Sequence, residues 1–179
     1  MKGCSVNVGR GQKRSGPPRT VDSGRRYGVW LLSRREYSRF QIAQKLRQKE
    51  YPDDVAMAVL DWLEEMGLQS DRRFMEMDVR RRLASGKGPA YVRRALSVAG
   101  ISGMDEEISM AIEGALPDPV LRATEILARK FRSFSGDRKD RDRAYRFLAS
   151  RGFSMDVIGD AVRAFVAHSA PLSEGEEDP

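Results

Sequence analysis

The sequence has few of the residues that build reactive centres. It contains one cysteine, Cys4, and one histidine, His168, among 179 residues. A single cysteine excludes an internal disulfide. A histidine–cysteine metal site needs several such ligands, and Cys–His catalysis needs its two residues side by side. Cys4 falls in an expected N-terminal arm and His168 at the end of the last expected helix, so we expect neither kind of centre.

Long apolar runs are also missing. No run approaches the roughly 18 residues that a membrane-spanning helix requires. The N-terminus has no apolar stretch of the kind found in a secretion signal. We therefore expect a cytoplasmic protein with no membrane contact.

Motifs that bind phosphate or activate water are absent from the sequence as well. The segment Ser85-Gly-Lys-Gly lacks the spacing of a phosphate-binding loop and joins two expected helices instead of following a strand. Acidic pairs such as Asp53-Asp54 and Glu106-Glu107 stand near helix starts or on exposed faces, where they complement the helix dipole. We expect a binding protein that is not an enzyme and needs no cofactor.

The charge is unevenly distributed along a chain whose formal net charge is +6. Residues 1–26 hold seven basic side chains and one acidic one, whereas the tail from Pro171 holds four acidic ones. A basic arm suits contact with a polyanion or an acidic protein surface, but a solvated leader without a partner explains it equally well. With 40% hydrophobic and 32% charged residues, the part between them has the composition of a folded domain.

Helical periodicity dominates that folded part, and no segment alternates with the period of a strand. Ser38, with Gln41 three residues later, has the pattern of a capping box at a helix start. Further expected helices carry apolar stripes, and one such stripe runs from Val55 to Met66. We expect Trp30 and Trp62 to lie in the core. We divide the chain into a disordered basic arm (1–24), three three-helix units (25–68, 69–116 and 117–170) and an acidic tail (171–179).

The three units read as copies of one repeat. Tyr51, Ile101 and Phe153 each follow a helix break, and they are spaced by 50 and then 52 residues. Each has a leucine five residues before it. Apolar or small residues recur at matching positions after Tyr51 and Phe153, and the middle copy fits if the segment 102–105 holds an insertion of two residues. A fixed period with three helices per unit predicts an all-α fold, an elongated tandem array of about nine helices.

Basic residues remain as candidate binding residues. The helical period places Arg81 opposite the apolar stripe of its helix, with Arg80 and Arg82 flanking that stripe. Such residues suit nucleic-acid phosphate or an acidic protein groove, although ordinary solvated surface explains them too. The candidates are Arg80, Arg81, Arg82, Lys87, Arg93, Arg94, Arg138, Lys139 and Arg141.

Several segments together resemble the RecX family. They are Arg34-Arg-Glu-Tyr-Ser-Arg39, Lys45-Leu-Arg-Gln-Lys49, Asp71-x-x-Phe74, Gly86-Lys-Gly-Pro89, Gly100-Ile101 and Arg151-Gly-Phe-Ser154, and the likeness covers about 25–168. Those proteins are small bacterial regulators of the RecA recombinase, built from tandem three-helix repeats. The sequence departs from them at Glu50, where glycine is common, so we expect this helix to be ended in another way.

The resemblance implies that the protein binds the groove of RecA filaments on single-stranded DNA. It would then limit the recombinase, ATPase and LexA-cleavage-promoting activities of RecA, as part of DNA repair and the SOS response. We expect a monomer, with weak direct DNA binding possible. The alternative is a DNA-binding protein of the helix-turn-helix type, since three short helices with basic surfaces also describe many DNA readers.

Overall fold

The computed structural model describes residues 19–169, and this part of the chain is helical throughout, without strands. The N-terminal unit consists of α1 (Val21–Leu32), α2 (Arg39–Gln48) and α3 (Asp53–Glu65). The middle unit consists of α4 (Asp71–Ala84), α5 (Pro89–Val98) and α6 (Asp105–Ala115). The C-terminal unit consists of α7 (Pro119–Lys130), α8 (Arg138–Ser150) and α9 (Met155–Ser169). None of these helices is long and apolar enough to cross a membrane.

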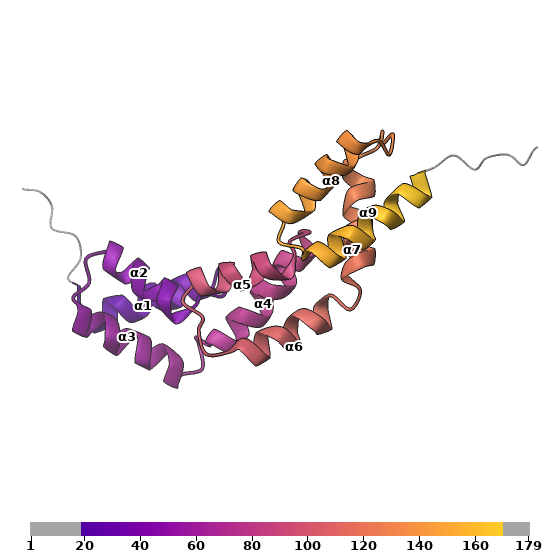
Figure 1. Ribbon diagram of the computed structural model, residues 1–179. Helices are drawn as coiled ribbons and strands as arrows, with labels where there is room; N and C mark the ends of the chain where they lie inside the picture. The colour runs from indigo at the N-terminus through magenta and orange to yellow at the C-terminus, as the bar shows by residue number, and fades with distance from the viewer. Residues whose placement is uncertain (1–18, 170–179) are drawn as a thin grey trace, which may run out of the picture.

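The three units follow one another in an elongated row (Figure 1). Each has a hydrophobic core of its own, built from its own three helices. The leucines five residues before the repeat-marking residues, Leu46, Leu96 and Leu148, are fully buried in the three cores. The prediction of an all-α, elongated array of three-helix repeats is therefore confirmed.

The same hydrogen bonds end the second helix of every unit. The backbone N–H of Tyr51 donates to the carbonyl oxygen of Leu46 over 3.1 Å, and the matching bonds of Ile101 and Phe153 are 3.0 and 3.3 Å long. A bond across five residues that follows a left-handed residue defines the Schellman motif, in which the two end residues also make an apolar contact. The five-residue spacing between the leucine and Tyr51, Ile101 or Phe153 therefore reflects a helix stop that is repeated in every unit.

The N-terminal unit shows where hydrophobic periodicity misleads. Trp30, predicted to lie in the core, is 49% exposed, and Met66 is 58% exposed. The buried face of α1 instead carries Gly24, Gly28 and Leu31. A Cβ atom at Gly28 would lie 2.7 Å from the Leu63 side chain, so the glycines let α1 approach α3 closely. Small residues with this spacing form a packing face that a search for large apolar residues overlooks.

The first helix also begins earlier than expected. We predicted helical structure from about Arg25, after a disordered arm over 1–24, but α1 starts at Val21. Its N-cap is Thr20, and Thr20 and Ser23 exchange hydrogen bonds between side chain and backbone in a capping box. Ser23 accepts the returning bond from the Thr20 backbone N–H, where glutamate or glutamine is usual, so the capping box was hard to recognise in the sequence. Most of the predicted arm, and the predicted tail over 171–179, lie outside the described residues.

Candidate interaction surface

The units are joined by one contact that occurs twice. At the first junction, the hydroxyl of Ser38 at the start of α2 donates to the carbonyl oxygen of Ala99, which follows α5, over 2.6 Å. At the second, the backbone N–H of Gly88 at the start of α5 donates to the carbonyl oxygen of Arg151, which follows α8, over 2.7 Å. The two donors are 50 residues apart and the two acceptors 52, which is the spacing of the repeats. The N-terminal and middle units therefore each place the start of their second helix on the turn of the unit that follows.

The turn that receives this helix start requires glycine at both junctions. Gly100 and Gly152 have φ angles of 81° and 85°, in the left-handed region. A Cβ atom at Gly100 would lie 2.4 Å from Phe40 Cβ, and one at Gly152 would lie 2.4 Å from the backbone nitrogen of Tyr91. Both backbone conformation and space therefore exclude larger residues here.

Glu50 occupies the matching position in the N-terminal unit, and its φ angle is 60°. The expectation that this helix would be ended in another way is wrong, since the stop is the same and glutamate adopts the left-handed conformation. The side chain fits because Glu50 is exposed, and among the described residues no unit precedes it to pack against the turn. Left-handed backbone is unfavourable for a residue with a side chain, so this position stores strain.

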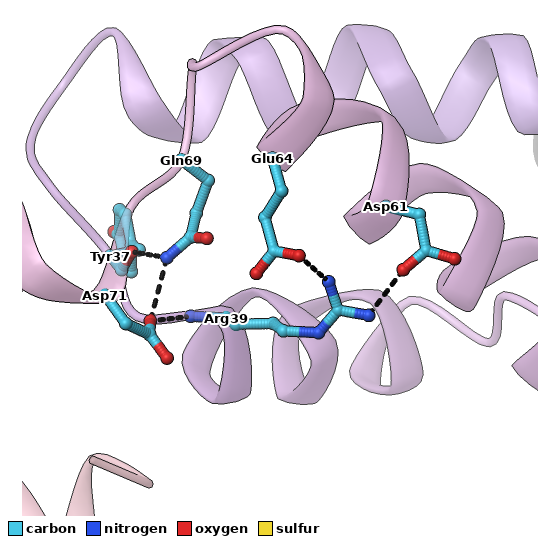
Figure 2. Close-up of polar contacts among 6 residues, drawn as sticks. All are labelled: Tyr37, Arg39, Asp61, Glu64, Gln69 and Asp71. Carbon is cyan, nitrogen blue, oxygen red and sulfur yellow. Dashed lines mark hydrogen bonds and ion pairs between the residues drawn. The ribbon is translucent and has the colours of Figure 1, made fainter. Parts of the chain in front are cut away.

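Polar side chains surround the first junction (Figure 2). Asp71, at the start of α4, accepts a 2.8 Å bond from the backbone N–H of Arg39 and another of 2.8 Å from the side chain of Gln69. The Gln69 amide also donates to the carbonyl oxygen of Tyr37 over 3.3 Å. These bonds fix the segment that enters α2 against the segment that enters α4.

Arg39 extends this network to α3. Its guanidinium donates to Asp61 over 2.6 Å and to Glu64 over 2.5 Å. The hydrogen bond with Asp61, followed by the charges of Glu64 and Asp61, raises the pKa of Arg39. Because the guanidinium is partly exposed, its two ion pairs contribute only modestly to the free energy of unfolding. We infer that they serve mainly to orient α2.

The capping box predicted at Ser38 forms only in part. The Ser38 hydroxyl accepts from the backbone N–H of Gln41 over 3.1 Å, as expected. The Gln41 side chain does not return the bond, and its Oε1 atom is buried without a partner. The buried Ser38 hydroxyl instead donates its proton across the junction.

Two of the three predicted basic residues of α4 form ion pairs with a buried aspartate. Asp78 is 3% exposed and forms ion pairs with both Arg81 and Arg82. Arg81 points outward, as predicted, with a side-chain exposure of 63%. It nevertheless has a structural role, because it and Arg82 together neutralise the Asp78 carboxylate. The burial of Asp78, beside an apolar stripe and a run of arginines, does not show in the helical periodicity of the sequence.

The other predicted residues of the middle unit face different ways. Lys87 lies 4.4 Å and Arg82 lies 5.8 Å from the ring centre of Tyr91, so these two cations share one aromatic side chain. Arg80 instead lines a cleft of about 900 Å³ between α4, α6 and α7. Arg93 donates to the Ser109 hydroxyl over 3.0 Å, toward α6, and Arg94 is exposed.

Arg138, Lys139 and Arg141 form a separate group. They are exposed at the N-terminal end of α8, whereas the residue that follows the C-terminal end of α8 makes the junction with α5. Thirteen helical residues extend about 20 Å, so the group lies about that far from the junction. Bonds from the Ser135 N–H and hydroxyl lower the pKa of Asp140 in the same turn. The nine predicted residues therefore do not form one continuous basic face.

Within residues 19–169, no group of three or more histidine, cysteine, aspartate or glutamate side chains is placed to hold a metal ion. The features that sequence reasoning missed are contacts between units, namely Ser38 with Ala99, Arg39 with Asp71, and Arg151 with Gly86. The Gly100-Ile101 and Arg151-Gly152 pairs marked the receiving turns in the sequence. Nothing in the sequence marked which helix start would meet them.

Comparison with known proteins agrees with this architecture. Residues 25–63 match the family model for the first three-helix domain of RecX, and residues 122–162 match the model for the third. A crystal structure of RecX from Lactobacillus salivarius superposes with a TM-score of 0.62 at 22% identity, covering 81% of this chain and 96% of that one. This likeness supports the fold.

Sequence relatives identify the family. The regulatory protein RecX of Chromohalobacter salexigens is 42% identical over 135 residues, which are 75% of this chain and 87% of the relative. The regulatory protein RecX of Pseudomonas entomophila is 39% identical over 136 residues, or 75% and 86%. Identity of this degree over most of both chains shows that the protein belongs to the RecX family of regulatory proteins.

Proposed function

We propose that the protein binds RecA filaments on single-stranded DNA and limits the recombinase, ATPase and coprotease activities of RecA. Membership of the RecX family carries this proposal, because regulation of RecA is what the resemblance to that family implies. The protein would act in the cytoplasm, as a monomer and without catalysis of its own.

The repeat architecture supports the proposal. Three units in a row give an extended body, and an extended body can follow a groove and touch several subunits of a filament (Figure 1). One bound molecule would then affect more than one RecA subunit. Basic side chains on different faces would meet acidic protein or DNA phosphate, each with a modest contribution that salt screens.

Binding measured at several salt concentrations tests this proposal. We expect the labelled protein to bind RecA–single-stranded-DNA filaments more tightly than either naked single-stranded or duplex DNA at physiological salt. A helix-turn-helix DNA reader would instead bind duplex without RecA, with an affinity that falls steeply as salt rises. Equal affinity for naked duplex and for filaments would overturn the proposal in favour of DNA binding.

Single exposed residues test the contact surface. Arg94→Gln removes an exposed charge on α5 for which no ion pair occurs among the described residues, so the fold should be unaffected. If the basic residues of the middle unit contact the filament, this variant should bind filaments several-fold less tightly at low salt. The control is Arg163→Gln on α9, a similarly exposed arginine that was not predicted to bind.

A further inference from the structure

All the charged side chains that line a small pocket at the second junction are positive. Its volume is about 290 Å³, and it lies between the end of α4, helix α7 and the end of α8. Four cationic side chains line it, and none of its lining residues is acidic. The four are Arg122, Arg129, Lys130 and Arg151.

Two of these cations donate to carbonyl oxygens at and just after the end of α4. Arg122 donates to the carbonyl oxygen of Ala84 over 2.9 Å and pairs with Glu125 over 2.9 Å. Arg151 donates to the carbonyl oxygen of Gly86 over 3.1 Å, and its guanidinium lies 4.4 Å from the ring centre of Phe147. Both guanidinium groups are therefore oriented before any ligand arrives, which lowers the entropy lost on binding.

The other two cations have no acidic partner among the described residues. Arg129 and Lys130 are exposed in the last turn of α7, and no ion pair involves either. Their position at a helix C-terminus is favourable for the helix dipole. That role accounts for their position along the helix, but it does not require them to share a concave surface with Arg122 and Arg151.

Larger cavities of the protein differ in this respect. The cleft of about 900 Å³ between α4, α6 and α7 has arginines on its wall together with Glu76, Glu107 and Asp118. A cavity of about 790 Å³ along α7 and α9 likewise combines Arg132 with Asp118 and Glu125. Cavities of mixed sign do not select an anion, whereas a concave site of one sign concentrates ions of the opposite charge.

We propose that the junction pocket binds a phosphate group. Arginine presents parallel N–H donors that match phosphate oxygens, and lysine adds a compact charge that suits the same ligand. Sites for whole small-molecule ligands have volumes of roughly 300–1,000 Å³, so this pocket suits one phosphate or two linked ones. The phosphate comes either from a nucleic-acid strand or from a free phosphate compound. The proposal goes beyond RecA regulation, since it requires no RecA.

Pyrophosphate is the probe for the pocket itself. We expect saturable binding to the full-length protein, followed by the amide signals of Gly86 and Arg151 in nuclear magnetic resonance spectra at constant ionic strength. The double variant Arg129→Gln/Lys130→Gln should weaken binding at least tenfold. The matched control, Arg47→Gln/Lys49→Gln, removes the same exposed charges from the N-terminal unit and should bind like the parent. Arg151→Lys keeps the charge but loses the planar fork, and it should also weaken binding.

Fluorescent single-stranded oligonucleotide, titrated without RecA, identifies the source of the phosphate. If the strand supplies it, the double variant should bind less tightly than the control, and each lost phosphate contact should flatten the logarithmic salt dependence by about 0.7. Pyrophosphate binding that needs the pocket, with unchanged oligonucleotide affinity, assigns a free phosphate compound. The proposal is overturned if the parent shows no saturable pyrophosphate binding, or if the double variant and the control bind equally well. Circular dichroism confirms the fold, and the single variant Lys130→Gln replaces the double variant if that one unfolds.

Discussion

The hydroxyl of Ser38 donates a hydrogen bond to the carbonyl oxygen of Ala99, 2.6 Å away and 61 residues later in the chain. The same oxygen atom of Ser38 accepts a bond from the backbone N–H of Gln41 and so caps α2. One fully buried side chain therefore both starts a helix and joins the first two units. Its two bonds connect local helix geometry with the assembly of the array.

Ser38→Ala should therefore cost more than the loss of a helix cap. A lost serine cap costs about 1 kcal/mol, and a buried carbonyl left without its partner adds about 1–3 kcal/mol. We expect a decrease of about 2–4 kcal/mol in the free energy of unfolding, measured with urea. Ser70→Ala is the control, because Ser70 caps α4 by a 3.3 Å bond from the Arg73 N–H, and it should cost only about 1 kcal/mol. Equal losses in the two variants would show that the bond to Ala99 contributes nothing.

The turn glycines separate backbone strain from contact between units. Gly67 has a φ angle of 64°, and nothing lies within 4 Å of a Cβ atom built there, whereas the backbone of Tyr91 lies 2.4 Å from one built at Gly152. Gly67→Ala should cost about 1 kcal/mol through left-handed strain alone. Gly152→Ala should cost at least about 2 kcal/mol more, because the second junction must move apart. Equal melting temperatures of the two variants would contradict the junction contact.

At position 50, in contrast, replacing the native residue should raise the free energy of unfolding. Glu50→Gly relieves left-handed strain of about 1–2 kcal/mol, and the greater freedom of glycine in the unfolded chain offsets about 0.5–1 kcal/mol of it. We expect a net gain of about 0.5–1 kcal/mol in the free energy of unfolding. Lys49→Gly, one residue earlier and without a positive φ angle, serves as the control and should lower stability. A loss of stability in Glu50→Gly would show that this turn is not left-handed in solution.

Much of the fold could be predicted because each repeat is marked by hydrogen bonds between residues close together in the sequence. A leucine five residues before an aromatic residue or isoleucine, with a left-handed residue just before the latter, ends a helix through bonds within six residues. Such bonds depend on neighbours in the sequence, so a pattern search finds them. The packing of α1 escaped prediction because glycines at 24 and 28 fit against α3, and the value of a small residue depends on which helix lies opposite.

The candidate surface was harder to predict for the same reason. The basic residues were identified by type, but their grouping depends on how the units are placed. Lys87 and Arg82 come together at Tyr91, whereas Arg80 faces a different cleft. The pairing of Asp78 with two arginines depends on its burial, which its sequence neighbours do not disclose.

This pairing changes what a charge-removal experiment on α4 measures. Arg80/Arg81/Arg82→Ala would leave the buried Asp78 carboxylate without partners. Removing one partner of a fully buried pair costs about 3–5 kcal/mol, and since Arg81 is exposed we expect about 2–3 kcal/mol here. Arg80→Ala alone should change the free energy of unfolding by less than about 0.5 kcal/mol. If the triple variant is as stable as the parent, Asp78 does not depend on these arginines.

Regulation of RecA is the central claim, and it is tested most directly by the DNA-dependent ATPase activity of RecA on single-stranded DNA. The protein should be titrated from well below to above the RecA concentration at physiological salt. We expect the ATPase rate to fall well before one molecule is present per RecA subunit, since an extended array can act on several subunits. An ATPase rate that stays unchanged over the whole range would contradict the claim.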